Sequence, residues 1–284
     1  MHAAQELLHF RKMHAAGNVL LLFDSRETGE RDWPKLAVAT ADAHRAVGHD
    51  GILVVSVGGT AAFRQRMFNP DGSEDMCGNG LRCTAKYLHD QGDIGGESVC
   101  LDTLAGPRVV QVLSSQGNRG MVRAELGPAK VREVRLNWRG KQAHAVPADL
   151  RGELGEAVLV DVGTPHLVLL PHAEPPEADW RAASAFLELH AGACARTSVT
   201  WLFPQAPDRA RLRIWERAVG ETLSCGTGAG AALVAGQRLG VLGEAARISS
   251  AGGVLEASRD SSGALWVAGP AETICESWWP AFAG

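Results

Sequence analysis

The feature that most constrains this chain is an internal repeat of a cysteine-glycine motif followed by a helix-like stretch. The first copy, CGNGLRCTAKYLHDQG, runs from Cys77 to Gly92, and the second, CGTGAGAALVAGQRLG, runs from Cys225 to Gly240. Both copies open Cys-Gly-x-Gly and reach a glycine 15 positions later, where a helix commonly ends. The repeat predicts two similar halves, each with one cysteine immediately before a helix N-terminus.

Short runs rich in Val, Leu and Ile recur along the rest of the chain and predict β-strands. Each run is bounded by Gly, Pro or Asp, which commonly end strands. The expected strands cover residues 18–24, 51–57, 98–104, 108–114, 122–127, 157–163, 166–171, 199–204, 210–217 and 264–270. Few helical patterns separate them, which favours an α+β fold with mixed, mostly antiparallel sheets over a doubly wound fold.

The segment LGPAKV, residues 126–131, is expected to connect the two halves. The predicted first domain covers residues 1–127 and carries Cys77, and the second covers residues 128–270 and carries Cys225. The C-terminal tail, about 271–284, is expected to return to the first domain. Duplication would make the halves a pseudo-twofold pair, with the two helix starts facing across a cleft.

Composition argues against several classes of function. The 284 residues include 28 Lys+Arg and 32 Asp+Glu, a net charge of −4, with no basic stripe, so nucleic acid is not an expected partner. No apolar run approaches the roughly 20 residues that span a bilayer, and the N-terminus lacks the apolar region of a secretory signal. We therefore expect a cytoplasmic protein with no membrane partner, whose six cysteines stay reduced.

The cysteines could form a disulfide, a metal site or reactive thiols. Cys77 and Cys83 would point about 240° apart on a helix, so they should share neither a metal nor a disulfide. No Cys-x-x-Cys is present and no histidines stand at ligand spacing beside them, so no metal is expected. The cysteines taken as small buried or incidental residues are Cys83, Cys100, Cys194 and Cys275. Cys77 and Cys225 could also be core thiols if taken singly, but their repetition in one motif favours a chemical role.

A thiol at a helix start has a specific chemistry. The unpaired N–H groups there carry about half a positive charge, which lowers the pKa of a cysteine and binds a carboxylate. Two such ends on one ligand would hold its carboxylate between two sulfurs, which can remove a proton from one face of a carbon and return one to the other. A lone nucleophile would need one cysteine, and a redox pair would not need two anion sites. The glycine-rich segments match neither the phosphate-loop nor the dinucleotide fingerprint, which argues against nucleotide binding.

Four segments together resemble the motifs of the diaminopimelate epimerase family, in family order and at family spacing. They are FRKMHAAGN (10–18), FNPDGSEDMCGNGLRC (68–83), GTPH (163–166) and WERAVGETLSCGTGAGAA (215–232). The resemblance implies an epimerase of two similar α/β domains, each a mixed sheet wrapped around a central helix, with the substrate in the cleft between them. The family inverts one α-carbon of L,L-diaminopimelate to give the meso isomer. The resemblance also implies a small amino-acid substrate, no cofactor such as PLP, and a homodimer.

The resemblance also assigns roles to single residues. Cys77 and Cys225 match the two acid/base thiols, and Glu216 and His166 match groups that support their chemistry. The residues that match substrate contacts are Asn18, Asn69, Gly78, Asn79, Thr164, Ser198, Glu216, Arg217, Gly226 and Thr227. Among them, the residues after each cysteine would hold the reacting carboxylate, and Arg217 would hold the distal one.

Each of these residues also has a purely structural interpretation. His166 could be a buried core histidine, Asn69 a turn residue, and Asn18 a cap or turn residue. Glu216 and Arg217 could be an exposed pair at a strand end. Their occurrence together within the motifs favours the site.

Four positions depart from the family pattern. Thr164 and Ser198 stand where the family usually has asparagine, Gly51 stands where glutamine is common, and Val19 replaces an aspartate. Threonine and serine lack the two-donor amide of asparagine, and these positions bear on the distal end of the substrate. The sequence therefore indicates the type of reaction more strongly than the substrate.

Three other functions stay open at this point. The first is an isomerase of the phenazine-biosynthesis type, which would use a carboxylate base and leave two thiols unexplained. The second is a racemase for another amino acid. The third is a non-catalytic protein that binds amino acids or senses redox state. A cysteine protease would leave the second motif without a role.

Overall fold

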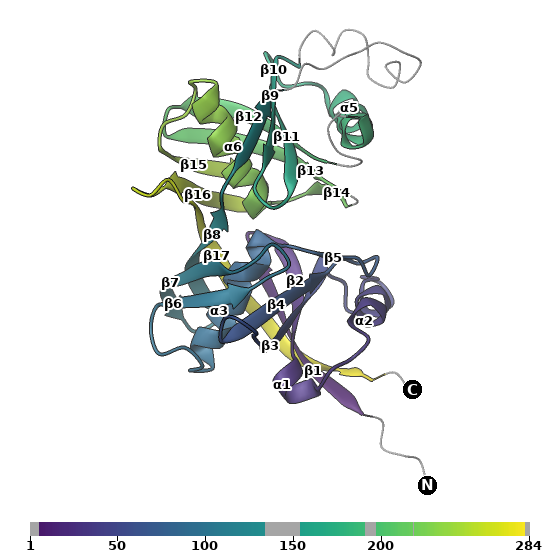
Figure 1. Cartoon of the computed structure of the whole chain (residues 1–284). Coiled ribbons are helices and arrows are strands. Elements are labelled where there is room, and N and C mark those ends of the chain that lie inside the picture. Colours follow the sequence, from purple (N-terminus) through teal and green to yellow (C-terminus); the bar gives the residue numbers. More distant parts are fainter. Residues whose placement is uncertain (1–5, 134–153, 191–196, 218, 282–284) are drawn as a thin grey trace. The chain divides into compact units, whose positions relative to one another are not determined.

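Two compact units make up the chain, and each is described by itself. The computed structural model describes residues 6–133, 154–190, 197–217 and 219–281 (Figure 1). Unit 1 comprises Met1–Glu125 and Ala268–Gly284, and unit 2 comprises Leu126–Val267. The chain passes between the units within strands β8 (Arg119–Gly127) and β17 (Leu265–Pro280). The predicted limits of two epimerase domains stay a prediction.

Unit 1 consists of short strands and three helices among its described residues. Its other strands are β1 (Leu7–Ala15), β2 (Asn18–Asp24), β3 (Gly51–Val57), β4 (Phe63–Phe68), β5 (Glu74–Asp75), β6 (Ser98–Asp102) and β7 (Arg108–Gln116). Its helices are α1 (Ser25–Thr28), α2 (Trp33–Thr40) and α3 (Gly78–Asp90).

The strands of unit 1 form a closed ring around α3. The pairs β1–β2, β3–β4, β6–β7 and β7–β8 are antiparallel, and β2–β3 and β4–β6 are parallel. β17 pairs antiparallel with β1 and also pairs with β8, which closes the ring. Every residue of α3 from Gly78 to Leu88 is buried, as expected for a helix that the sheet covers on all sides. Helix α2 packs on a separate apolar cluster that includes Trp33 and Phe23.

Unit 2 has the same kind of architecture. Its strands are β9 (Lys130–Glu133), β10 (Glu156–Asp161), β11 (Pro165–Leu170), β12 (Ser198–Ala206), β13 (Arg209–Glu216), β14 (Gly220–Thr222), β15 (Ala245–Ser250) and β16 (Gly253–Arg259). Its described helices are α5 (Glu177–His190) and α6 (Gly226–Arg238). The first eleven residues of α6, Gly226 to Gly236, are all buried against the strands. Helix α5 packs on another cluster, which contains Trp180 and Trp201.

The order of strand pairing is the same in both units. In unit 1 an antiparallel pair (β1–β2), a parallel pair (β2–β3) and two antiparallel pairs (β3–β4, β4–β5) precede the central helix. In unit 2 the pairs β10–β11, β11–β12, β12–β13 and β13–β14 follow the same order before α6. After each central helix, a strand pairs in parallel with an earlier one, β6 with β4 and β15 with β13. The cysteine-glycine repeat therefore belongs to a repeat of the fold.

The predicted fold class is confirmed, and the sequence located many of its strands. Nine of the ten expected segments lie on strands whose ends differ from the prediction by three residues or fewer. The tenth, 264–270, is part of β17, which continues to Pro280. The prediction missed the elements β1, β4, β5, β9, β14, β15, β16, α1, α2 and α5. No helix of the described part of the chain is long and apolar enough to cross a membrane.

Candidate active site

Each of the two repeated cysteines is the N-cap residue of its helix. Cys77 (φ −129°, ψ 112°) precedes α3, and Cys225 (φ −136°, ψ 118°) precedes α6. Sγ of Cys77 accepts a hydrogen bond from the backbone N–H of Gly80 at 3.3 Å, and Sγ of Cys225 accepts one from Gly228 at 3.4 Å. Both thiols lie at helix starts, as the repeat predicts, and the positive ends of two helix dipoles act on their sulfurs.

The second glycine of each motif gives the sulfur room at the first helical turn. A Cβ at Gly80 would lie 2.6 Å from Cδ2 of Leu53 and 3.4 Å from Cβ of Cys77. A Cβ at Gly228 would lie 3.3 Å from Cβ of Cys225 and 3.4 Å from Cε1 of His166. Both positions are too crowded for a larger residue to fit without displacing its neighbours. Packing therefore favours glycine at both positions, in addition to the close approach of backbone to a ligand that glycine allows.

The amide groups beside Cys77 have one orientation that satisfies their hydrogen bonds. Buried Arg82 donates from Nη2 to Oδ1 of Asn79 at 2.6 Å. Because a guanidinium only donates, Nδ2 of Asn79 must face Oδ1 of Asn18, which lies 3.2 Å away. Nδ2 of Asn18 then donates to the carboxylate of Asp50 at 3.0 Å. Sγ of Cys77 lies 3.9 Å from Oδ1 of Asn18, so this thiol faces a hydrogen-bond acceptor.

The groups beside Cys225 form a buried chain of a different kind. Sγ of Cys225 lies 3.2 Å from Oγ1 of Thr227, which lies 3.0 Å from Nε2 of His166. Nδ1 of His166 lies 3.1 Å from Oγ1 of Thr200. Burial, together with the smaller effect of the charge of Arg217, lowers the pKa of His166 to about 3, so the imidazole is neutral at physiological pH. His166 is thus a buried core histidine that is linked to the sulfur of Cys225 through Thr227.

These two arrangements occupy corresponding places in the two units. The residue two places after the cysteine bonds to a side chain at the start of the second strand, Asn79 to Asn18 at β2 and Thr227 to His166 at β11. That side chain bonds in turn to a residue in the third strand or immediately before it. The sequence prediction missed these third residues.

Other predicted site residues of unit 2 meet at one end of its sheet. β11 begins beside the start of β12, and β13 ends there, because His166 pairs with Ser198 and Val199 pairs with Trp215. At this end the backbone N–H of Arg217 donates to Oγ of Ser198 at 3.1 Å. Glu216 is half-buried, and its Oε1 accepts from Oγ1 of Thr222 at 2.6 Å.

Thr164, immediately before β11, has a buried hydroxyl. The residue is 8% exposed, and its Oγ1 has no hydrogen-bond partner among the described residues. A buried hydroxyl without a partner costs free energy, so it is a candidate to bond to a ligand.

Asn69 lies at the corresponding end of the sheet of unit 1. It follows β4 and forms a turn in which its backbone N–H donates to the carbonyl of Ser73 at 2.8 Å and its Nδ2 to Oγ of Ser73 at 3.0 Å. Its structural role as a turn residue is therefore real, and a substrate contact stays a prediction. Gly51 at this end packs tightly, since a Cβ there would lie 2.5 Å from Cε of Met67.

The other described cysteines have different environments. Cys83 is buried, and burial raises the pKa of its thiol to about 12. Cys100 and Cys275 are exposed, whereas Cys194 lies outside the described residues. None of the five described cysteines is part of a disulfide bond. Within the described ranges, no group of three or more His, Cys, Asp or Glu side chains could hold a metal ion.

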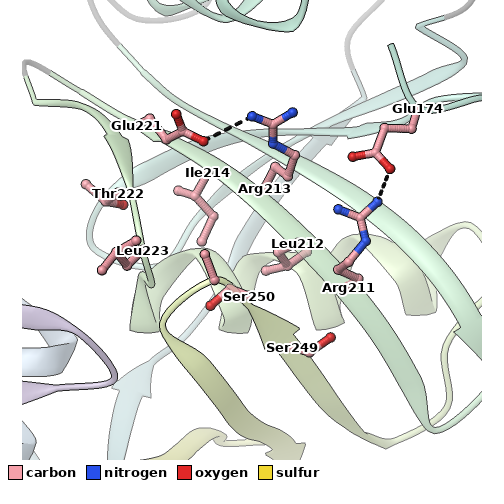
Figure 2. Close-up of a pocket in the computed structure, with 11 residues that line it drawn as sticks. Glu174, Arg211, Leu212, Arg213, Ile214, Glu221, Thr222, Leu223, Ser249 and Ser250 are labelled. Carbon is pink, nitrogen blue, oxygen red and sulfur yellow. Dashed lines mark hydrogen bonds and ion pairs between the residues drawn. The ribbon is translucent and has the colours of Figure 1, made fainter. Parts of the chain in front are cut away.

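A pocket of about 370 Å³ lies in unit 2 beside the edge of β13 (Figure 2). Arg211 pairs with Glu174 at 2.5 Å and Arg213 pairs with Glu221 at 3.0 Å, so each arginine in its wall has a carboxylate partner. Neither cysteine of the repeat lines it. Thr222 lines this pocket and donates a hydrogen bond to Glu216. This bond connects the pocket to the candidate site.

Three of the residues that hold the site together were missed from the sequence. Arg82 is a charged residue within the buried first turns of α3, and Asp50 stands at the foot of an apolar strand. Thr200 is a buried hydroxyl in the apolar strand β12. For Thr200, a polar residue inside an otherwise apolar strand was an available signal. Asp50 precedes its strand, and α3 has several other polar residues beside Arg82, so neither position has such a signal.

Comparison with known proteins agrees with these observations. A family model described as diaminopimelate epimerase matches residues 10–131 and 158–274. The chain belongs to the diaminopimelate epimerase family. It is 32% identical to the diaminopimelate epimerase of Pelotomaculum thermopropionicum, over 96% of this chain and 99% of that protein. It is 35% identical to that of Synechococcus elongatus, over 94% of this chain and 96% of that protein. As a member of this family, the protein is an isomerase.

Solved structures share the fold at low sequence identity. A hydroxyproline epimerase from Agrobacterium vitis has a TM-score of 0.73 and 14% identity, with 98% of this chain and 93% of that chain covered. A phenazine biosynthesis protein of the PhzF family from Bacillus anthracis has a TM-score of 0.68 and 15% identity, over 96% of this chain and 99% of that chain. At such identities the likeness concerns the fold alone.

Proposed function

We propose that the protein inverts the α-carbon of L,L-diaminopimelate to give meso-diaminopimelate, with Cys77 and Cys225 as its two acid/base groups. The observation that carries this proposal is the pair of cysteines that cap the central helices of two units with the same order of strands. The full-length identity of 32–35% to diaminopimelate epimerases supports the substrate. A phenazine-type isomerase would leave both helix-capping thiols without a role.

In the proposed mechanism, one cysteine is a thiolate and removes the α-proton, and the other is a thiol and delivers a proton to the opposite face. The backbone N–H groups after Cys77 and Cys225 hold the reacting carboxylate and stabilise the charge that develops on it. His166 and Glu216 support the thiol chemistry, and Arg217 holds the distal carboxylate with a guanidinium fork. Closure of the two units around the substrate would exclude water and keep the protons between the sulfurs.

The remaining substrate contacts belong to the same proposal. Asn18, Asn69 and Asn79 would contact the substrate from unit 1, and Thr164, Ser198 and Thr227 from unit 2. The reaction would need no PLP or other cofactor, since two thiols supply both proton transfers. A homodimer stays a prediction from the family resemblance, and a cytoplasmic location stays a prediction from the composition of the sequence.

Proton exchange with solvent tests this mechanism. In D₂O the inverted product should carry deuterium at the α-carbon from the first turnovers, while the substrate that remains should not. A thiol holds one proton, so the proton taken by one cysteine is not the one delivered by the other. Mass spectrometry and NMR of diaminopimelate isomers measure both quantities. An inverted product without deuterium would refute the two-base mechanism.

Replacement of the cysteines tests their roles one by one. Cys77→Ser and Cys225→Ser keep an N-cap acceptor and should fold, but a hydroxyl is a far weaker acid than a thiol. Each should lower kcat by about 10²–10⁴-fold or more, as expected for the loss of an acid/base group. Cys100→Ser is the matched control, because Cys100 is exposed on β6 and should leave kcat unchanged. Wild-type turnover by Cys225→Ser would contradict the proposal.

A racemase for another amino acid is the second candidate. The unpartnered hydroxyl of Thr164 and the serine at position 198 favour it, because these residues stand where the family pattern has amides. A panel of diaminopimelate, glutamate and histidine distinguishes the two candidates by which substrate loses its stereochemistry. Binding without α-proton exchange for every substrate would instead indicate a non-catalytic binding protein.

A further inference from the structure

A chain of four buried polar groups ends at the sulfur of Cys225. It runs from Thr200 through His166 and Thr227 to Cys225, with separations of 3.1, 3.0 and 3.2 Å. Thr200 and His166 are 0% exposed, Thr227 is 5% exposed and Cys225 is 4% exposed. Water therefore cannot readily substitute for any group in the chain, and each hydrogen bond depends on the direction of the next.

A neutral imidazole allows two directions for this chain. It has one N–H donor and one nitrogen acceptor, whereas a threonine hydroxyl can donate one bond and accept others. If His166 carries its proton on Nε2, it donates to Thr227, and the hydroxyl of Thr227 is free to donate to the sulfur. If the proton is on Nδ1, Nε2 accepts from Thr227, and Oγ1 of Thr227 can accept from a thiol.

Each direction suits one protonation state of Cys225. A thiolate needs a donor, which Thr227 supplies in the Nε2–H tautomer. A thiol needs an acceptor, which Thr227 supplies in the Nδ1–H tautomer. The ring holds one proton in both states, so the exchange places no charge on the buried imidazole.

The far end of the chain must be able to serve both tautomers. Thr200 can donate to a bare Nδ1 and can accept from Nδ1–H, which a carboxylate or an ammonium group could not both do. Unit 1 offers the contrast, because Asp50 in the corresponding place only accepts. The bonds from Asn18 to Asp50 therefore have one fixed direction, and Cys77 always faces the Oδ1 acceptor of Asn18.

We infer that Thr200 is a positioning residue that lets His166 change tautomer and thereby match the hydrogen bond at Cys225 to either the thiol or the thiolate. The inference rests on the proposed function, in which Cys225 must alternate between these two states. In that reaction, the proton that leaves Cys225 goes to the α-carbon of the substrate, and the proton that it gains comes from there.

The charges around these hydrogen-bonded groups are compatible with the inference. The backbone N–H of Gly228 donates to the sulfur in both states. Arg217, after β13, lowers the pKa of His166 together with burial, which keeps the ring neutral. Glu216, which has a carboxylate, is the residue before Arg217 in the sequence. A neutral ring is necessary, because an imidazolium would donate from both nitrogens and fix the direction of the bonds.

NMR of the substrate-free full chain tests the inference. Protein with ¹⁵N-labelled histidine and ¹³Cβ-labelled cysteine is titrated over pH, and the signals are assigned from His166→Gln and Cys225→Ala spectra. In the wild type, the ¹⁵N shifts of His166 should change from the Nδ1–H to the Nε2–H pattern at the pH where the ¹³Cβ shift of Cys225 reports ionisation. Ionisation of Cys225 without any change in His166 would overturn the inference.

Two substitutions at position 200 make the test specific. Thr200→Val keeps the shape but removes the partner of Nδ1. Because an orphaned N–H is less tolerated than an orphaned lone pair, His166 should then stay Nε2–H at every pH. The ionisation midpoint of Cys225 should fall by roughly 0.5–1 pH unit, the size expected for one net hydrogen bond. Thr200→Ser keeps the hydroxyl and should restore both the tautomer change and the wild-type midpoint.

The outcomes separate this inference from the proposed function. If Thr200→Val titrates like the wild type and like Thr200→Ser, Thr200 has only a packing role and the inference fails. If the tautomer change is present but Cys225→Ser still inverts the substrate at the wild-type rate, the two-base mechanism fails and the tautomer coupling stands.

Discussion

At the scale of single residues, the burial of His166 has a thermodynamic cost that depends on pH. Burial lowers its pKa from 6.5 to about 3, so the folded protein binds fewer protons at this residue than the unfolded chain does. The stability gained from a neutral His166 is complete above pH 6.5 and is lost as pH falls from 6.5 toward 3. Acid should therefore destabilise unit 2 before its carboxylates titrate.

The size of this effect can be measured by urea unfolding. Between pH 7 and pH 5 the wild type should lose about 2 kcal/mol more unfolding free energy than His166→Gln does. The reason is that unfolding exposes the imidazole of His166 and lets it bind a proton, which favours the unfolded chain of the wild type only. His49, whose pKa burial lowers to about 4, contributes in the same sense to both proteins and cancels in the comparison. Parallel pH profiles for the two proteins would contradict a neutral, buried His166.

The sequence located the groups at the helix starts but not the groups that orient them. Cys77 and Cys225 could be found because a repeated motif and capping chemistry are local in sequence. Asp50 and Thr200 bond to side chains of other strands, and Arg82 bonds to Asn79 within α3, but none of these contacts leaves a periodic pattern in the sequence. The sequence therefore predicted the thiols and their nearest polar neighbours, and missed groups that lie two or three hydrogen bonds from the sulfurs.

At the scale of elements, the two central helices end in the same way. Gly92 (φ +74°) follows the C-cap of α3, and Gly240 (φ +73°) follows the C-cap of α6. A Cβ at either glycine would have no atom within 4 Å, so backbone conformation alone requires glycine there.

Substitution at these termini should have a purely conformational cost. Gly92→Ala and Gly240→Ala should each lower the unfolding free energy by about 1–2 kcal/mol, because an L-residue is strained in the left-handed region. Gly92→Asn and Gly240→Asn should lower it less, since asparagine tolerates that region. Chemical denaturation measures the differences, and equal stabilities for the Ala and Asn variants would argue against this explanation.

Elements with a strong local pattern were predictable, and those that depend on distant partners were not. The buried strands β2 and β3 are continuous apolar runs, and their expected limits are confirmed. By contrast, β5 and β14 are two and three residues long and have no pattern of their own. Helix α2 did have a signal, since Asp32 caps it and a proline stands in its first turn. Most of β17 has exposed or half-buried side chains, so its length follows from its pairing with β1 rather than from its hydropathy.

At the scale of the whole molecule, unit 1 is assembled from two separate parts of the chain. β1 pairs with β17 from Leu7 opposite Pro280 to His14 opposite Glu272, and the backbone N–H of Ala281 donates to the carbonyl of Glu6 at 2.8 Å. Unit 2, in contrast, is one continuous segment, Leu126–Val267.

Fragments should therefore differ in their ability to fold. A fragment of residues 126–267 should unfold cooperatively, whereas a fragment of residues 1–125 should not, because its ring would be open between β1 and β8. A permuted fragment that joins residues 268–281 to residues 6–125 through a short linker should regain cooperative unfolding, since Ala281 and Glu6 are hydrogen-bonded neighbours. Circular dichroism during urea titration measures all three. A cooperative transition in the 1–125 fragment would show that β17 is dispensable.

The late position of β17 also determines when each unit can be completed during translation. All of unit 2 is synthesised before the part of β17 that closes the ring of unit 1. Until then, the newly made N-terminal sheet has two open edges, β1 and β8. A cell that makes this protein has to keep those edges from pairing with other nascent chains for the time needed to add more than a hundred residues.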